Sequence, residues 1–310
     1  EFTVCDDFLD ANGNDTVDNS DTDGISAFDF SSVTPEIIAL FPPGQVLKVT
    51  YYRNKFDALA EINVISDPSN YRNIGYANNQ TIYARVDSDL DNDCLGFGAH
   101  ITLNVNPVPS ATVVDNMIAC DNLDDGNATN GEVAFNLESN TPTILGTQSA
   151  ADYTVTYHET PAQAQSGANP LASPYTNTTR DLQTIYVRVT NNTTGCFTNH
   201  EQFDLIVNPL PVANFVDNIE ICDDASDGSA NNGFSQSIDL SVQTATILGT
   251  QDPTQFSVSY HTSLFNAQNN VDPVDENPYT NDTPFRETIY VRVFNATTGC
   301  ANGISTFDVI

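Results

Sequence analysis

The sequence predicts an all-β protein made of three tandem antiparallel β-sandwich modules. The first observation is a stretch that occurs three times and reads as a strand, a polar turn and a cysteine: TIYARVDSDLDNDC (81–94), TIYVRVTNNTTGC (184–196) and TIYVRVFNATTGC (288–300). The second is that short apolar runs alternate with turns rich in Asn, Asp, Gly and Pro, and that no long helical period occurs. Several short strands in roughly 100 residues are typical of an immunoglobulin-like sandwich.

The repeated stretch is expected to be a core strand. Side chains in a strand alternate between the two faces of its sheet. Ile185, Val187 and Val189 should therefore face the core, while Tyr186 and Arg188 face away from it.

The other elements follow in the same order in each module. An acidic loop after the first cysteine leads to a strand near residues 28–30, 135–137 and 238–240. A short apolar turn, which we expect to be helical, lies at 34–40, 141–146 and 244–249. A second strand at 49–52, 155–158 and 258–261 precedes a variable polar segment, the repeated strand, its cysteine and a last strand.

These landmarks place the modules at residues 1–107, 108–209 and 210–310. The linkers are NPVP (106–109) and NPLP (208–211), and paired prolines make a short, stiff connection. Stiff linkers of this length predict an extended rod. The third module stops at FDVI (307–310), where an equivalent of NPLP would follow, and we found neither a signal peptide nor an apolar run long enough to span a membrane. We therefore expect the chain to be an excerpt of a longer protein.

The charge limits the partners. The net charge is −32, from 9 Lys and Arg against 41 Asp and Glu. Nucleic acids and anionic membrane surfaces need cationic partners, so neither is expected to bind, and no membrane insertion is expected. The acidity fits a solvated extracellular surface, or one that collects divalent cations; acidity for solubility alone is the alternative.

The six cysteines occur two per module at matching positions. This spacing favours disulfides within each module, Cys5–Cys94, Cys120–Cys196 and Cys222–Cys300, tying the first strand to the last near one pole. Disulfides imply an oxidising, extracellular compartment. The alternative is free buried thiols.

The acidic loops are the candidate metal sites. Oxygen ligands at every second residue, with glycine in the turn, suit a hard cation such as Ca²⁺. The first-module loop lacks the glycine position and the closing Glu of an EF-hand, and the alternative is a solvated acidic turn. The candidate calcium ligands are Asp6, Asp7, Asp10, Asn12, Asn14, Asp15, Asp18, Asp21 and Asp23 in the first module, with Asp121, Asp124 and Asp125 in the second and Asp223, Asp224 and Asp227 in the third.

A second acidic cluster precedes the second cysteine of the first module. Asp89, Asp91 and Asp93 are its candidate ligands. A Cys5–Cys94 disulfide would bring this cluster to the acidic loop, and the two together could form one calcium site that stiffens a module junction.

No catalytic constellation is predicted. Arg85, Arg188 and Arg292 recur at one position, where they could bind an acidic sugar. We expect them instead to stack on the tyrosines of the repeated strand, Tyr83, Tyr186 and Tyr290, or to pair with neighbouring carboxylates. The four histidines are expected at the surface, and none has a Ser or Cys nucleophile at a fixed spacing.

The run from VTYHETPAQAQSGANPLASPYTNTT to QTIYVRVTNNTTGC (155–196) resembles the repeat modules of very large surface adhesins of gliding and marine Bacteroidota, many of them exported by type IX secretion. The resemblance covers all three modules. It implies a stalk or adhesive array on the cell surface, whose partners are neighbouring modules of the same long chain. Because the module repeats without a polar constellation unique to one copy, no enzyme activity is expected. The alternative is a set of carbohydrate-binding modules that contact a surface polysaccharide or glycan.

Overall fold

A computed structural model describes residues 1–14, 22–90, 93–124, 126–223, 225 and 227–310. The internal contacts divide the chain into two units, and the division passes through the second module. Unit 1 consists of Glu1–Val114, Ser139–Leu171 and Tyr186–Gln202, and unit 2 of Asp115–Glu138, Ala172–Ile185 and Phe203–Ile310. The first module therefore lies in unit 1 and the third in unit 2.

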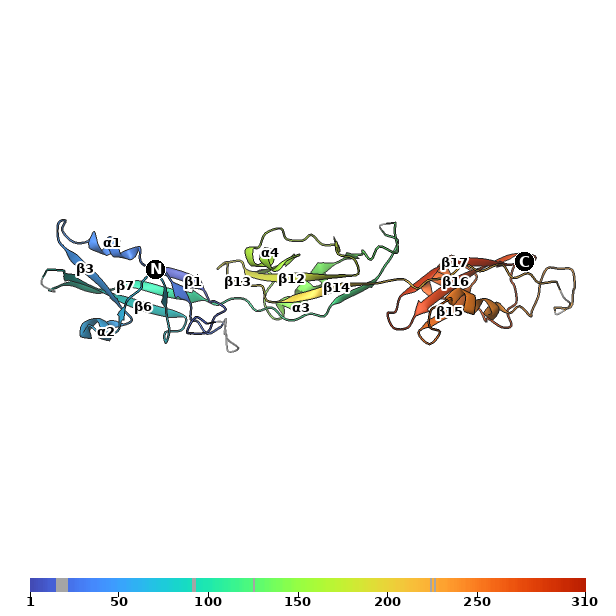
Figure 1. Cartoon of the computed structure of the whole chain (residues 1–310), viewed down its shortest axis with the longest axis horizontal. Coiled ribbons are helices and arrows are strands. Elements are labelled where there is room, and N and C mark those ends of the chain that lie inside the picture. Colours follow the sequence, from blue (N-terminus) through green and yellow to red (C-terminus); the bar gives the residue numbers. More distant parts are fainter. Residues whose placement is uncertain (15–21, 91–92, 125, 224, 226) are drawn as a thin grey trace. The chain divides into compact units, whose positions relative to one another are not determined.

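The first module is a sandwich of two sheets around one core. Its larger sheet has the strand order β1-β7-β6-β3-β4, of which β1, β7, β6 and β3 are labelled in Figure 1, and the smaller sheet pairs β2 with β5. Phe28 and Tyr71 from the small sheet pack with Ile82 and Leu103 from the large one. The elements are β1 (Phe2–Cys5), β2 (Ala27–Phe28), α1 (Val33–Ile38), β3 (Leu47–Tyr52), α2 (Lys55–Ala60), β4 (Val64–Ile65), β5 (Tyr71–Arg72), β6 (Asn79–Ser88) and β7 (Cys94–Asn106).

The first strand of this module pairs in parallel with the last. Phe2 lies opposite Leu103, and Cys5 lies opposite Asn106 at the end of β7. The pairs among β3, β4, β6 and β7 are antiparallel, as predicted, and the β1–β7 pair at the edge of the sheet is a parallel exception. The parallel pairing places Cys5 at the far end of β7 from Cys94.

The second module contains strand pairs like those of the first, and each pair described here lies within one of the two units. In unit 1, β10 pairs antiparallel with β12, which also pairs with β13. In unit 2, β8 pairs in parallel with β14, and β9 pairs with β11. The elements are β8 (Met117–Cys120), β9 (Ala134–Phe135), η1 (Leu137–Asn140), α3 (Thr141–Leu145), β10 (Tyr153–His158), α4 (Pro161–Ser166), β11 (Tyr175–Thr176), β12 (Leu182–Asn191), β13 (Phe197–Thr198) and β14 (Gln202–Asn208).

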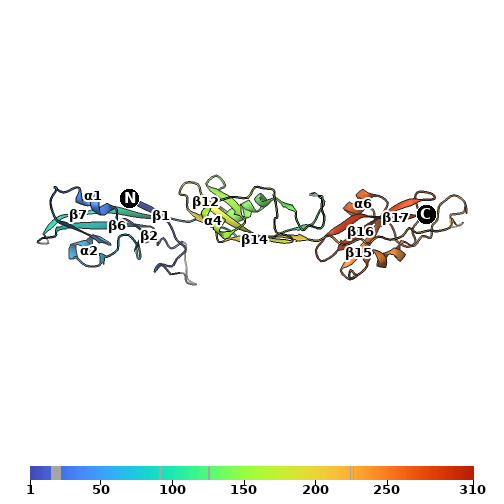
Figure 2. The same ribbon diagram turned by 45° about the horizontal axis from the view of Figure 1, so that its top comes forward.

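The third module keeps the order β15-β16-β17, and α6 packs against β16 and β17 (Figure 2). Single bridges replace the short strands: Ile219 pairs in parallel with Val309, and Ile238 pairs antiparallel with Tyr279. The elements are η2 (Leu240–Gln243), α5 (Thr244–Leu248), β15 (Phe256–His261), α6 (Leu264–Asn269), β16 (Glu287–Asn295) and β17 (Ala301–Val309). None of the helices in the described ranges is long and apolar enough to span a membrane.

The repeated strand forms the core as predicted. Ile185, Val187 and Val189 are buried, and so are Ile289, Val291 and Val293 in the third module. The expected helical turn is also present in each copy, as α1, α3 and α5. A tyrosine hydroxyl holds each of these helices: Tyr51, Tyr157 and Tyr260 hydrogen-bond Thr34, Thr141 and Thr244 at 2.7, 2.8 and 2.8 Å.

Two of the four histidines are not at the surface, contrary to expectation. His158 and His261 are fully buried. The Nδ1 atom of His158 lies 2.9 Å from the Ala168 carbonyl oxygen, and Nε2 lies 2.9 Å from the Thr156 hydroxyl. His261 makes the same contacts with Val271 and Ser259. Burial lowers the pKa of both imidazoles, with the neighbouring Arg188 or Arg292 adding to the effect.

An asparagine links the loop after the first cysteine to the rest of each module. Asn281 accepts the Ser235 N–H and donates to the carbonyl oxygens of Gly233 and Thr283. Asn177 accepts the Val133 N–H and donates to the carbonyl oxygens of Gly131 and Thr179. Asn73 accepts the Ser26 N–H and donates to the carbonyl oxygens of Gly24 and Tyr76. All three side chains are buried, so each amide satisfies backbone groups that water does not reach.

The buried histidines predict a loss of stability in acid. Because their folded pKa lies below the unfolded value of about 6.5, the unfolded state binds more protons as the pH falls through that value. We expect the free energy of unfolding in urea to fall between about pH 7.5 and 5.5, and to fall less in the H158Q/H261Q variant. The exposed His100 gives the control, H100Q, which should follow the wild type. An equal loss in wild type and double variant would contradict the assignment.

Removal of one asparagine link should destabilise the third module. Asn281→Ala deletes three hydrogen bonds and leaves buried backbone groups unpaired, so we expect a loss of about 2–4 kcal/mol in urea unfolding. Asn269→Ala, at an exposed position with one hydrogen bond to Phe265, should change stability by less than about 0.5 kcal/mol. Similar losses in both variants would show that Asn281 is not the link described.

Candidate functional site

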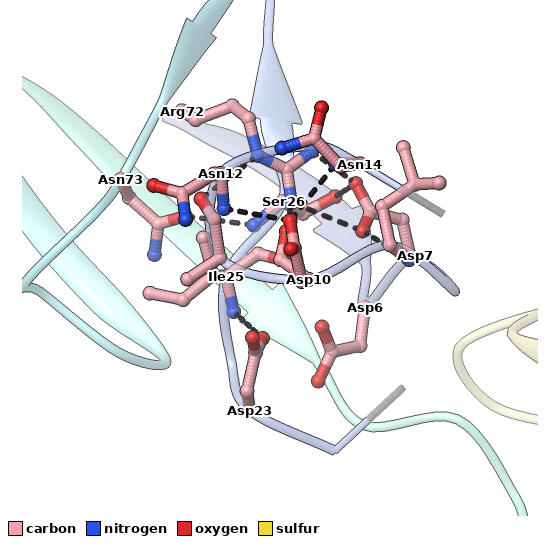
Figure 3. Close-up of polar contacts among 12 residues, drawn as sticks. Asp6, Asp7, Asp10, Asn12, Asn14, Asp23, Ile25, Ser26, Arg72 and Asn73 are labelled. Carbon is pink, nitrogen blue, oxygen red and sulfur yellow. Dashed lines mark hydrogen bonds and ion pairs between the residues drawn. The ribbon is translucent and has the colours of Figure 1, made fainter. Parts of the chain in front are cut away.

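Arg72 on β5 holds the acidic loop of the first module (Figure 3). Its guanidinium forms a two-pronged ion pair with Asp7, with Nη1–Oδ2 at 2.6 Å and Nη2–Oδ1 at 3.1 Å. The same guanidinium donates to the carbonyl oxygens of Asp10 and Ala11. One of the few basic side chains in the chain thus neutralises Asp7 and orders the start of the loop.

Other carboxylates in this loop stabilise its turns. Asp10 Oδ1 accepts the N–H groups of Asn12 and Asn14 at 3.0 and 2.8 Å. Asp23 Oδ1 accepts the Ile25 N–H at 2.7 Å. These are the local side-chain to backbone bonds that Asp commonly forms in turns.

The aspartate after the first cysteine closes the loop in every module. Asp6, Asp121 and Asp223 each accept a glycine N–H through Oδ2: Gly24 at 2.9 Å, Gly131 at 2.9 Å and Gly233 at 2.6 Å. In Asp6 the other oxygen, Oδ1, is buried and has no hydrogen-bond partner among the described residues. Burial raises the pKa of Asp6 to about 6, and the charges of Asp23 and Asp7 add to the shift.

The other described ligand candidates take part in local hydrogen bonds, through the carboxylate in Asp227 and through the main chain in Asp124, Asp89 and Asp93. Asp227 accepts the Ser229 N–H and the Asn232 amide, and the Asp124 N–H donates to Asn122. In the second cluster, the Asp89 N–H donates to the Val46 carbonyl and the Asp93 carbonyl accepts the Ser88 N–H. Six of the predicted ligands lie outside the described residues: Asp15, Asp18, Asp21, Asp91, Asp125 and Asp224.

The described residues do not form a calcium site by themselves. Within the described ranges, no three His, Cys, Asp or Glu side chains are placed to hold a metal ion. Asp6 Oδ1 offers one free buried oxygen, whereas Ca²⁺ takes six to eight. Calcium binding by the whole loop, which includes Asp15, Asp18 and Asp21, stays a prediction.

The disulfides join neighbouring modules, and the predicted pairing within modules is wrong. Cys5 of the first module bonds Cys196 of the second, and Cys120 of the second bonds Cys300 of the third, with Cα–Cα distances of 5.5 and 5.6 Å. Cys94 and Cys222 are free and exposed. The predicted pairs Cys5–Cys94, Cys120–Cys196 and Cys222–Cys300 do not form, and the joint calcium site that depended on Cys5–Cys94 loses its basis.

The strand pairing explains the error. Cys5 lies opposite Asn106, whereas Cys94 begins the same 13-residue strand. At about 3.3 Å per residue, the two cysteines are separated by about 40 Å along β7. A disulfide needs Cα atoms roughly 4.4–6.8 Å apart, so a bridge within the first module is impossible.

Further contacts join neighbouring modules or hold the segment after a linker. In unit 1 the Phe8 ring meets the His200 ring edge-on, with centroids 4.1 Å apart. In unit 2 the Asn302 amide donates to the Pro211 carbonyl in the linker. After each linker a glutamine side chain exchanges two hydrogen bonds with the backbone: Gln148 with Ser110, and Gln251 with Val212.

The repeated arginines are structural, as expected. Arg188 donates to the carbonyl oxygens of Ala164 and Gln165 at the end of α4, and its guanidinium lies 3.4 Å from the centre of the Phe197 ring. Arg292 makes the equivalent contacts at the end of α6. Arg85 instead pairs with Glu61 and Asp87. The aromatic partner is Phe197 rather than the tyrosine of the repeated strand.

Several solved structures resemble the chain weakly. Chicken CNTN1 FN1-FN3 domains match at 10% identity and a TM-score of 0.27, over 86% of this chain and 89% of that one. Zebrafish RET cadherin-like domains 1 to 4 match at 9% and 0.17, over 86% of this chain and 66% of that one. Human CDH23 EC21-23 matches at 11% and 0.18, over 88% and 90%. At these TM-scores the likeness supports no conclusion about ligand or partner.

No curated protein matches the chain. A family model does, and its description agrees with the disulfides found here. The model of the Flavobacterium inter-domain disulphide bond domain matches residues 1–109, 116–211 and 218–310. The chain belongs to this family and carries three copies of its domain.

Proposed function

We propose that the chain is a structural segment of an extracellular surface protein, a stalk or part of an adhesive array, in which the disulfides limit extension under force. The observation that supports the proposal is that each disulfide joins one copy of the domain to the next. Each junction is thus crossed twice, once by the linker and once by a disulfide. Such bonds persist outside the cell, where the environment is oxidising.

The two disulfides overlap in the sequence, and this overlap determines how the chain responds to a pull on its ends. Cys120 lies inside the loop that Cys5–Cys196 closes, and Cys196 lies inside the loop that Cys120–Cys300 closes. The shortest covalent path between the ends therefore uses residues 1–5, 120–196 and 300–310. Even with every module unfolded, this path contains only about 90 residues, so the two ends can be separated by at most about 320 Å. In the reduced chain the greatest end-to-end distance is about 1,100 Å.

Single-molecule pulling from the two ends tests the proposal. We expect unfolding to stop at an end-to-end distance of about 320 Å in oxidised protein and to reach about 1,100 Å with a reductant. The Cys5→Ser variant, which keeps only Cys120–Cys300, should stop near 450 Å because its shortest path is about 130 residues.

The Cys94→Ser variant is the matched control. Because Cys94 is free, its loss should leave the maximum end-to-end distance of the oxidised protein unchanged. Equal extension with and without reductant would contradict the proposal.

A further inference from the structure

Tyr52 at the end of β3 lies where the other two modules have a buried histidine. It lies opposite Tyr83 of the repeated strand, as His158 and His261 lie opposite the equivalent tyrosines. Both imidazoles are hydrogen-bonded at each ring nitrogen. Tyr52 is only 3% exposed, and its hydroxyl makes no hydrogen bond to another residue that the structure describes. A buried polar group without a partner in the protein needs an explanation, and a bound ligand is one.

A second hydroxyl is released by the same change. Thr50 lies at the position of Thr156 and Ser259, whose hydroxyls contact Nε2 of the histidine in their own modules. With Tyr52 in place of the histidine, the Thr50 hydroxyl has no such partner. The two residues are two apart in a strand, so their hydroxyls lie on the same face of β3.

Three further positions of the first module carry a charge where the other two modules carry none. They are Lys48 in place of Thr154 and Ser257, Asp87 in place of Thr190 and Phe294, and Glu61 in place of Gly167 and Asn270. Glu61 ends α2 in the left-handed conformation, with a φ of 54°, which Gly and Asn adopt with less strain. A strained residue of this kind is typical of functional sites.

All these positions line one cavity of the first module. The cavity measures about 440 Å³, and small-molecule sites usually measure about 300–1,000 Å³. Its wall includes Lys48, Thr50, Tyr52, Glu61 and Asp87. The residues that distinguish the first module therefore meet in one place, although they come from β3, β6 and the end of α2. A purely structural role gives no reason for this.

The polar groups of the cavity lie close to one another. Arg85 pairs with both carboxylates, at 2.8 Å to Glu61 and 2.7 Å to Asp87. Burial raises the pKa of the Tyr52 hydroxyl, and the charges of the two carboxylates and of Arg85 act on it as well, so the hydroxyl lies near all three groups. The Glu61 side chain is 48% exposed, so its carboxylate can still accept hydrogen bonds from a ligand.

The charges in the cavity balance. The ammonium of Lys48 and the guanidinium of Arg85 offset the two carboxylates, so neither an anion nor a cation is favoured over a neutral molecule. Carboxylates accept hydrogen bonds, and the hydroxyl of Tyr52 both donates and accepts. A ligand that satisfies all these groups is neutral and carries several hydroxyls side by side.

We propose that this cavity binds a neutral sugar residue through neighbouring ring hydroxyls. The sugar hydroxyls donate to the Glu61 carboxylate and bond the hydroxyls of Thr50 and Tyr52. The C–H groups of the ring pack on Val64, which is 49% exposed, and on Pro68. The inference goes beyond the proposed structural function, because it makes the first module a recognition module and leaves the other two as spacers.

A titration with neutral monosaccharides tests the inference. D-glucose, D-galactose, D-mannose, L-fucose and N-acetyl-D-glucosamine are each added to the full chain at up to about 100 mM, which detects binding in the millimolar range. Amide chemical shifts are followed by NMR. We expect at least one sugar to shift the amides of residues 48–52 and 61–66 saturably, with no comparable shift at 154–158 and 257–261 in the equivalent strands.

Two variants test the contacts. Tyr52→Phe keeps the buried ring and removes one neutral hydrogen bond, so we expect about fivefold weaker binding. Glu61→Asn introduces the residue that the third module has as Asn270 in the same backbone conformation. It removes hydrogen bonds to a charged group, so we expect binding to weaken about tenfold or more. Tyr83→Phe is the matched control and should bind as the wild type does, because Tyr83 stacks on Phe97 outside the cavity wall.

The absence of a saturable shift with all five sugars, shifts of equal size in the equivalent strands, or unchanged affinity in Tyr52→Phe and Glu61→Asn would overturn the inference. The amide spectra also report whether each variant is folded. None of the variants changes a cysteine, so the pulling experiment tests the proposed function separately. Failure of the sugar site is therefore distinguishable from failure of the proposed function.

Discussion

The parallel pairing of the first and last strands determines how the modules are joined. In an antiparallel pair, the end of the first strand would lie near the start of the last, and Cys5 could have met Cys94. Because β1 runs parallel to β7, Cys5 lies opposite Asn106, next to the linker. The β8–β14 pair does the same for Cys120 and Asn208. Each first-strand cysteine is thereby placed at the pole where the next module begins, within reach of the cysteine turn of that module.

Recurrent polar contacts complete this arrangement. The aspartate after each first-strand cysteine bonds a glycine N–H, and the buried asparagine bonds the carbonyl of the same glycine. Together they hold the loop that follows the cysteine. Asp7 is neutralised by Arg72, and several other carboxylates of these loops accept backbone N–H groups, namely those of Asp6, Asp10, Asp23, Asp121, Asp223 and Asp227. These contacts hold the described part of the acidic loop, and calcium binding by the whole loop stays a prediction.

Much of the fold could be predicted from the sequence because local patterns determine it. The alternation of Ile185, Val187 and Val189 identifies a core strand, and the short apolar runs TPEII, TPTIL and TATIL identify the short helices. The helices α2, α4 and α6 were not predicted, although Asn54, Thr160 and Ser263 cap them. At six residues each, these helices are too short to show an apolar period.

The pairing of the cysteines could not be predicted in the same way, because strand direction is a property of the tertiary fold. An even number of cysteines, two per module, is compatible with either scheme. Only the scheme found here leaves one free thiol in the first module and one in the third. The burial of His158 and His261 could not be predicted for a similar reason. Their hydrogen-bond partners, the carbonyl oxygens of Ala168 and Val271, lie ten residues away in segments without a recognisable sequence pattern.

The most direct test of the account is disulfide mapping of the native protein after its free thiols have been alkylated. Proteolysis without reductant and mass spectrometry should recover peptides that join Cys5 to Cys196 and Cys120 to Cys300, with Cys94 and Cys222 alkylated. Peptides that join Cys5 to Cys94, Cys120 to Cys196 and Cys222 to Cys300, with no alkylated cysteine, would contradict it.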